Sequence, residues 1–320
     1  MSALRRIIPA FIAFGCASIA FAQTDTFPSK PIRFISCCTG FPEAVARVVA
    51  ERIGEQTRHQ VVVEAKPGAN GIIAAEYVAK SAPDGYTVLI GSNSTHAANQ
   101  SLYKKLNYDF VKDFVPVTAL SQGALMLAVN PALPANSVAE LTALARKEPG
   151  KLSYGWASSS TRVAMELYKQ TAGVQIVDVP YKTLPQATTD LLGGRLNLMI
   201  GDMVSLPPHV ATGKLRALAV TGTKRMPAFP DVPTMREAGV ADYELTFWLG
   251  VWAPAGTPPA IVQQLNEMVV AALKSDRARE FLVKAGSEPF PTTSAELMQF
   301  QIAEQRKWNR ILTGAGIQPE

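Results

Sequence analysis

The chain has 320 residues, of which 48% are hydrophobic and 18% charged, and its formal net charge is +5. It contains neither a Lys/Arg block nor a strip of mixed basic and aromatic residues, which argues against nucleic acid as a partner. The length is sufficient for two domains that each bury their own core.

The first residues have the pattern of a secretory signal peptide. Arg5 and Arg6 precede an apolar run over residues 7–20, and a small-x-small cleavage pattern ends at Ala22. The run is too short to cross a bilayer core as a helix. We therefore predict a periplasmic protein cleaved after Ala22 and without Cys16; acylation of Cys16 is a weaker alternative because the residues before it form a poor lipoprotein signal.

Short β-branched runs alternate with helical stretches along the rest of the chain. This alternation is typical of an α/β fold with largely parallel sheets. Strands are expected at residues 31–36, 60–67, 86–92, 125–131, 152–155, 174–181, 196–202 and 215–222. Helices are expected at residues 42–56, 72–82, 138–150, 161–173 and 184–195, followed by a helix-dominated tail from residue 260.

Two connections, residues 110–123 and residues 223–259, separate these runs of strands and helices. A chain that leaves one α/β unit, builds a second and returns to the first suits a hinged cleft that closes on a ligand. The predicted organisation is a signal peptide (1–22), the first part of lobe 1 (23–122), lobe 2 (123–226), and a return crossing with the second part of lobe 1 (227–320).

Motifs for catalysis and for metal binding are sparse. The three histidines show no metal-ligand spacing, and neither G-x-S-x-G nor a G-x-G-x-x-G after a strand is present. Ser101 and Lys104 form an S-x-x-K pair, which could indicate an exported serine hydrolase, but no S-D-N or following K-T-G accompanies it. We therefore expect no catalysis, no cofactor and no metal site, and we interpret the pair as surface residues of a helical turn.

Four loops at which a strand meets a helix could bind an anion: residues 36–43, 91–96, 156–162 and 201–205. Unpaired backbone N–H groups and the helix dipole favour a carboxylate at such places, although each loop taken alone could merely cap its helix. Several such loops in a two-lobed fold favour a ligand cleft. The candidate ligand-binding residues are Ser36, Cys37, Cys38, Thr39, Gly40, Phe41, Glu43, Ser92, Asn93, Ser94, Thr95, His96, Trp156, Ala157, Ser158, Ser159, Ser160, Thr161, Arg162 and Asp202.

Residues 82–118, 179–200, 213–239 and 247–266 contain long motifs, such as "APDGYTVLIGSNSTHAANQ" and "FWLGVWAPAGTPPAIVQQLN". In these motifs the chain resembles the Bug family, the periplasmic receptors associated with tripartite tricarboxylate transporters. The resemblance implies a type II periplasmic-binding-protein fold and capture of a small carboxylate without catalysis. It also implies membrane permease subunits as partners, although a membrane sensor is an alternative, and we expect a monomer.

Three loops depart from the pattern of that family. Glu43 stands at the position of the usual aspartate, and the loop before it is about two residues short. The loop before Arg162 is also short, and this arginine stands where the family often has histidine. After the strand at residues 196–202, Gly201 aligns with the usual aspartate, so that Asp202 follows one place later. The resemblance therefore supports the scaffold more strongly than a particular ligand.

The adjacent cysteines, Cys37 and Cys38, lie in the first of these loops. They could fill space where the family uses proline and glycine, or they could form a vicinal disulfide or a redox-sensitive gate. Such a disulfide would require a strained ring, so the exported fold must rely on its core rather than on a long-range bridge.

Five other residues have two interpretations each. Phe41 and Trp156 could stack on an aromatic carboxylate or fill space left by the short loops. Arg162 could pair with a second ligand carboxylate or lie on a solvated helix face. Glu43 suits the first turn of a helix, where a negative charge is favourable. His96 could line the cleft or be structural, whereas Trp248 is expected in the core.

Overall fold

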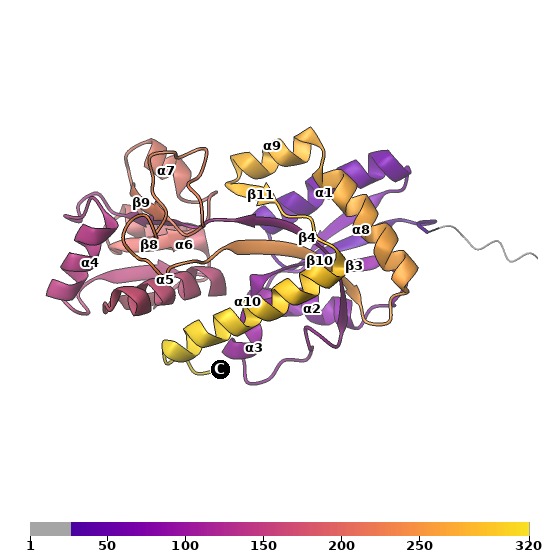
Figure 1. Ribbon diagram of the computed structural model, residues 1–320, viewed down its shortest axis with the longest axis horizontal. Helices are drawn as coiled ribbons and strands as arrows, with labels where there is room; N and C mark the ends of the chain where they lie inside the picture. Colours follow the sequence, from indigo (N-terminus) through magenta and orange to yellow (C-terminus); the bar gives the residue numbers. More distant parts are fainter. Residues whose placement is uncertain (1–26, 320) are drawn as a thin grey trace, which may run out of the picture.

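In a computed structural model, which describes residues 27–319, the chain forms two mixed β-sheets with helices packed around them (Figure 1). The predicted signal peptide, its cleavage site and Cys16 lie outside the described residues. Between residues 27 and 319, no helix combines the length and apolar character needed to cross a membrane.

The larger sheet has six strands in the order β11-β4-β10-β3-β1-β2. β1 is parallel to β2 and β3, whereas β10 runs antiparallel to both β3 and β4. The strands are β1 (Ile32–Ser36), β2 (Val61–Ala65), β3 (Thr87–Ser92), β4 (Phe114–Gly123), β10 (Phe247–Pro254) and β11 (Ser287–Pro289). The helices that follow or flank them are α1 (Phe41–Thr57), η1 (Ala69–Gly71), α2 (Ile72–Ala79), η2 (Ser94–Ala98), α3 (Asn99–Leu102), α8 (Pro259–Leu273), α9 (Asp276–Lys284) and α10 (Ser294–Gly314).

The smaller sheet has five strands in the order β7-β6-β8-β5-β9. β6 is parallel to β7 and β8, whereas β5 is antiparallel to β8 and β9. Its strands are β5 (Met126–Val129), β6 (Ser153–Trp156), β7 (Val177–Pro180), β8 (Leu198–Gly201) and β9 (Arg216–Val220). Its helices are α4 (Val138–Lys147), α5 (Ser159–Ala172), α6 (Leu184–Leu192) and α7 (Pro207–Ala211).

The expectation of largely parallel sheets is wrong, because both sheets mix parallel and antiparallel pairs. A strand–helix–strand crossover makes neighbouring strands parallel, but β5 follows β4 directly and β10 returns from the smaller sheet. Both predicted connections contain a strand that was not expected, β4 in residues 110–123 and β10 in residues 223–259. The segment around β10 is rich in proline and glycine. It becomes a strand because β3 and β4 pair with it on both sides.

β4 and β10 carry the chain between the two sheets, and α10 lies along them (Figure 1). α10 begins with a capping box between Thr293 and Glu296, which satisfies the first free N–H groups of the helix. It contacts β4 and η2 beside the larger sheet and α5 beside the smaller one. The buried face of α10 therefore joins the part of the molecule around the larger sheet to the part around the smaller sheet. It helps to determine where the loops of these two parts meet.

The expectation that Trp248 belongs to the core agrees with its position on β10. Its side chain is 0% exposed, and its Nε1 donates to Glu304 Oε2 on α10 at 3.1 Å. Trp252, four residues further along β10, is equally buried and donates from Nε1 to Gln301 Oε1 at 2.7 Å. Both indoles therefore gain hydrophobic burial without leaving an N–H group unpaired.

Candidate functional site

Two of the predicted ligand loops, one beside each sheet, touch directly. Asn93 Nδ2 donates to Ser160 Oγ at 2.7 Å, and the hydroxyls of Ser94 and Ser159 lie 2.6 Å apart. All four residues are buried, with between 0% and 6% of their surface exposed. The structure therefore brings together candidate residues that lie more than sixty positions apart in the sequence.

Local hydrogen bonds hold each of these loops in shape. After β3, the Ser92 N–H donates to Thr95 Oγ1, and the Thr95 hydroxyl is also within reach of the Ser92 carbonyl oxygen, both at 3.0 Å. On the other side, Ser158 is the N-cap of α5 and forms a capping box with Thr161. The loops are therefore held in shape by Ser92, Thr95, Ser158 and Thr161. The contact between the loops is made by the residues next to these, Asn93, Ser94, Ser159 and Ser160.

Five more candidates lie at the end of β1 and in the loop between β1 and α1. Ser36 and Cys37 are 0% exposed, Cys38 is half-buried, and Thr39 and Gly40 are exposed. Gly40 is the N-cap of α1, has a φ of 79° and provides no side-chain cap. The first free N–H groups of α1 therefore have no side-chain acceptor at the N-cap position, which is the condition under which a helix start can bind an anion.

Phe41 and Glu43, at the start of α1, have partners within the protein. The Phe41 ring lies 5.9 Å from that of Phe247 and 6.4 Å from that of Phe281, measured between ring centroids. Glu43 forms an ion pair with Arg47 one turn further along the helix. These contacts favour the space-filling interpretation of Phe41 and the first-turn interpretation of Glu43.

Trp156 and Arg162 form a cluster with Asp178, which the sequence interpretation did not include. Trp156 Nε1 donates to Asp178 Oδ2 at 3.1 Å, and the Arg162 guanidinium lies 4.6 Å from the centroid of the Trp156 ring. An Arg162 nitrogen is 4.0 Å from the same carboxylate, and the arginine side chain is 20% exposed. The only sequence signal for Asp178 is a single charged residue within an apolar β-branched run. Ala157 links this cluster to α5 by its N–H, which donates to Thr161 Oγ1 at 3.4 Å.

His96 is 0% exposed and stacks on Trp252, with 3.7 Å between the ring centroids. Its Nδ1 is 2.9 Å from Thr95 Oγ1, whereas Nε2 is buried without a partner. Burial lowers the pKa of His96 to about 3, because an imidazolium would lose its hydration there. The structural interpretation of this histidine is therefore favoured over one in which it lines the cleft.

Replacing His96 by phenylalanine should make stability less dependent on pH. An imidazole in the unfolded chain takes up a proton near pH 6.5, whereas folded His96 does so only near pH 3. Stability is therefore lost as the pH falls from about 6.5, and His96 alone should contribute about 2 kcal/mol of the loss between pH 7 and pH 5. Urea unfolding at both pH values should show that His96→Phe loses about 2 kcal/mol less than the original protein. An equal loss in both proteins would contradict the prediction.

Asp202 shapes the turn between β8 and α7. Its Oδ1 accepts the N–H groups of Val204 at 2.9 Å and Ser205 at 2.7 Å. Both hydrogen bonds are local, as in an Asx turn. The carboxylate is therefore already used by the backbone, and the structure gives it a role in forming this loop.

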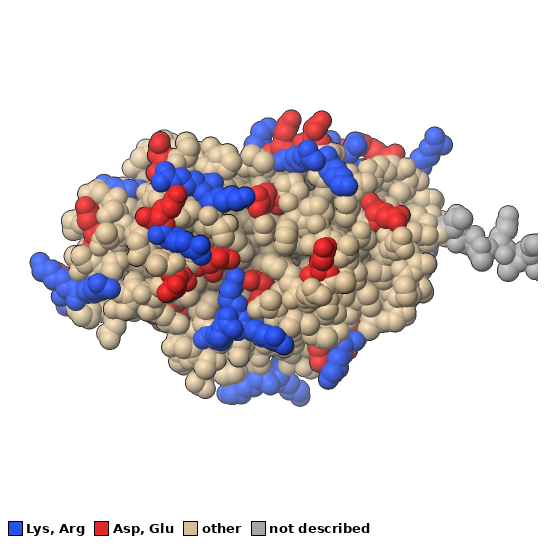
Figure 2. All heavy atoms as spheres, viewed as in Figure 1, with Lys and Arg blue, Asp and Glu red and all other residues tan. Residues whose placement is uncertain are grey.

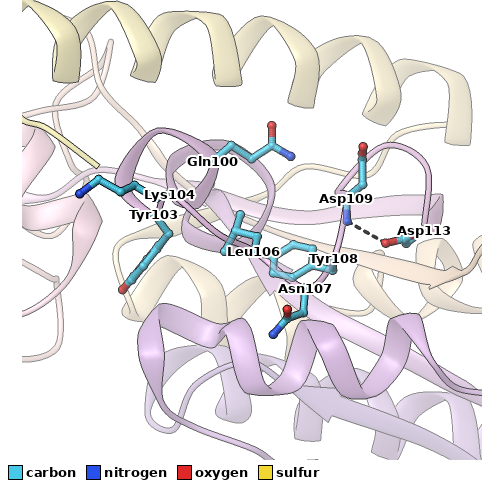
Figure 3. A pocket seen from close by; sticks show the side chains of 8 residues that line it. All are labelled: Gln100, Tyr103, Lys104, Leu106, Asn107, Tyr108, Asp109 and Asp113. Atoms are coloured by element: carbon cyan, nitrogen blue, oxygen red, sulfur yellow. Dashed lines mark hydrogen bonds between the residues drawn. The ribbon is translucent and has the colours of Figure 1, made fainter. Parts of the chain in front are cut away.

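A separate open cavity of about 470 Å³ lies beside the end of α3. Figure 3 shows Tyr103 and Lys104 at one end of it and Asp109 and Asp113 at the other. Ser101, the other half of the S-x-x-K pair, donates from Oγ to Asn309 Oδ1 at 3.0 Å. An amide oxygen is not a base that could accept a proton from a nucleophile, so this contact does not support the hydrolase alternative.

On the face shown in Figure 2, Lys and Arg side chains are interspersed with Asp and Glu. Within residues 27–319, no group of three or more His, Cys, Asp or Glu side chains is arranged to hold a metal ion.

Comparisons with known proteins agree on one family. A family model described as tripartite tricarboxylate transporter family receptor matches residues 45–317. The solved structure of R. palustris Rpa4515 with adipate is 36% identical in sequence and has a TM-score of 0.85. The match covers 92% of this chain and 100% of that chain. The structure of periplasmic binding protein BugD is 29% identical, with a TM-score of 0.81 and coverage of 92% and 100%. MatC from Rhodopseudomonas palustris with bound malate is 29% identical, with a TM-score of 0.79 and coverage of 89% and 100%.

Proposed function

Because the chain belongs to the receptor family of tripartite tricarboxylate transporters, we propose that it is a periplasmic receptor that captures a small dicarboxylate between its two lobes. It would present the closed, loaded form to the membrane permease subunits of such a transporter. Two similar structures carry dicarboxylates, adipate in one and malate in the other, which supports this class of ligand.

The observation that carries the proposal is the contact between the two buried loops. Asn93 and Ser94 follow a strand of the larger sheet, and they meet Ser159 and Ser160 at the start of α5. Each loop offers hydroxyl or amide groups, and neither needs a lysine or arginine to attract a carboxylate, because helix N-termini favour anions. A ligand that exchanged these interlobe hydrogen bonds for its own would be held by both lobes at once and would favour closure.

The cluster of Trp156, Arg162 and Asp178 could supply a second contact for the ligand. The Trp156–Arg162–Asp178 cluster lies next to α5, and Arg162 keeps a buried Nε without a partner. A second ligand carboxylate could accept from this guanidinium, although Asp178 already balances part of its charge. An aliphatic diacid carries its two carboxylates at opposite ends. One carboxylate could therefore bind where the two loops meet, and the other could bind near Arg162.

The test is isothermal titration of the purified protein with adipate and with malate, together with thermal unfolding in the presence of each diacid, of benzoate and of succinamide. We expect at least one of the two diacids to bind, and to raise the melting temperature by mass action, whereas neutral succinamide leaves it unchanged. A melting temperature that rises only with succinamide or benzoate, and with neither diacid, would overturn the proposed ligand class. Uptake of a labelled diacid should in turn require the gene; normal uptake without it would overturn the role in transport.

A further inference from the structure

The loop between β1 and α1 holds two free thiols side by side. Cys37 Sγ lies 3.4 Å from Cys38 Sγ, within reach of a thiol–thiol hydrogen bond, and 3.9 Å from Ser92 Oγ. Adjacent residues rarely bring their sulfur atoms so close, because their side chains usually diverge. The loop has thus placed a nucleophile and a second thiol within a short movement of each other.

The two thiols differ in access. Cys37 is 0% exposed and packs against Gly71, where an added Cβ would lie 2.9 Å from Cys37 Cβ. Cys38 is only half-buried. Cys38 is therefore the more accessible of the two thiols to a reagent from solution, whereas Cys37 is enclosed by the core.

The two thiols also differ in acidity. The hydrogen bond from the Cys37 thiol lowers the pKa of Cys38, because it stabilises the thiolate. The same hydrogen bond, together with burial, raises the pKa of Cys37 well above its ordinary value. Since the thiolate is the nucleophile in exchange reactions, the more accessible cysteine is also the more reactive one.

We propose that Cys37 and Cys38 form a thiol modification site that reacts with low-molecular-weight disulfides. The Cys38 thiolate attacks one sulfur of the disulfide RSSR, forming a mixed disulfide and releasing RS⁻. Cys37 then loses its proton and attacks Cys38 Sγ, which releases the second RS⁻ and leaves a disulfide between the two cysteines. Two thiols are oxidised and one RSSR is reduced to two RSH, so the exchange needs no further oxidant.

Closing this bond would change the loop. A disulfide requires about 2.05 Å between sulfur atoms, and neighbouring Cα atoms, about 3.8 Å apart, lie closer than in most disulfides. Because Cys37 is packed in place, Cys38 must move to close the bond. Its carbonyl oxygen accepts a hydrogen bond from Ser36 Oγ at 2.7 Å, and this contact would have to adjust. Thr39 and Gly40 follow directly and lead into α1. The product is strained and readily reduced, so the modification is reversible.

The experiment treats the purified, reduced protein with oxidised glutathione and follows its intact mass with time. The original protein should show a transient glutathione adduct and then the loss of two hydrogens. Cys37→Ser should keep the adduct, located on Cys38, because the resolving thiol is missing. Cys38→Ser should react with oxidised glutathione at least about tenfold more slowly than Cys37→Ser, because only the buried thiol remains. A folded original protein that shows neither an adduct nor the loss of two hydrogens, or equal rates in the two variants, would overturn the proposal.

The effect on ligand binding rests on the proposed function and is measured separately. Titration with adipate, or with malate if adipate does not bind, should show at least about fivefold weaker affinity after oxidation, reversed by dithiothreitol. Cys37→Ser/Cys38→Ser should bind with the same affinity before and after glutathione treatment. Unchanged affinity in the oxidised protein would overturn the link to the ligand loop. The mass measurement needs no ligand, so a failure of the proposed function and a failure of the thiol chemistry give different results.

Discussion

Replacing Asn93 by aspartate should weaken the binding of adipate or malate at least about 100-fold, or about 3 kcal/mol. Asn93 is 0% exposed at the junction of the two lobes, and its Nδ2 donates to Ser160 Oγ. Aspartate has nearly the same shape, and its carboxylate can still accept from the Ser160 hydroxyl. It would, however, add a buried negative charge beside the proposed anion, and a like charge that water cannot screen strongly disfavours binding.

The matched control for this variant is Asn309→Asp. Asn309 is exposed on α10, and its Oδ1 accepts from Ser101 Oγ, an interaction that aspartate can keep. This control adds the same charge away from the loop junction and should bind the diacid as the original protein does. Ser160→Ala, which removes a hydroxyl without adding charge, should weaken binding about tenfold. Affinity within threefold of the original in a folded Asn93→Asp protein would contradict the proposed position of the ligand.

Replacing Glu304 by leucine should lower the free energy of unfolding by about 3 kcal/mol. Glu304 is 6% exposed, and its Oε2 accepts the indole N–H groups of Trp248 and Trp308, each at 3.1 Å. Leucine would leave both N–H groups buried without an acceptor, and each such group costs about 1–3 kcal/mol. The measurement is urea unfolding, with the change read from the midpoint at constant slope.

Glu304→Gln separates the loss of these hydrogen bonds from the loss of charge. The Gln oxygen has two lone pairs and can accept from both indoles. The ion pair between Lys307 and Glu304 is lost, but the lysine side chain is 24% exposed and can turn its ammonium group into solvent, so Glu304→Gln should destabilise the protein less than Glu304→Leu. Equal destabilisation by the two substitutions would show that the charge, rather than the two hydrogen bonds, stabilises the joint between α10 and β10.

The order of strands and helices was largely predictable from the sequence. Runs such as residues 60–67 and 86–92 alternate with helical stretches, and local periodicity is enough to identify them. The start of α5 lies two residues earlier than expected, because Ser158 caps the helix through Thr161. The family and the periplasmic-binding-protein fold, which the resemblance implied, are confirmed by the family model and by the similar solved structures. The domain boundaries and the set of ligand-binding residues stay predictions.

The return strand β10 shows where periodicity was not sufficient. Its segment is rich in proline and glycine around a short apolar run, which indicated a connection. It forms the centre of the larger sheet because β3 and β4, distant in sequence, supply the hydrogen-bonding partners on either side. Such pairing depends on non-local contacts that no window of sequence contains.

By itself, the sequence determined the succession of elements and the family of the chain, because both are carried by local patterns and long continuous motifs. Only the tertiary structure decided that Asn93 and Ser94 lie against Ser159 and Ser160, and that His96 stacks on Trp252. It also decided which of the two adjacent cysteines is fully buried and which is only half-buried. These features depend on how α10 and the two crossing strands position the sheets, and distances between distant residues follow from packing rather than from composition.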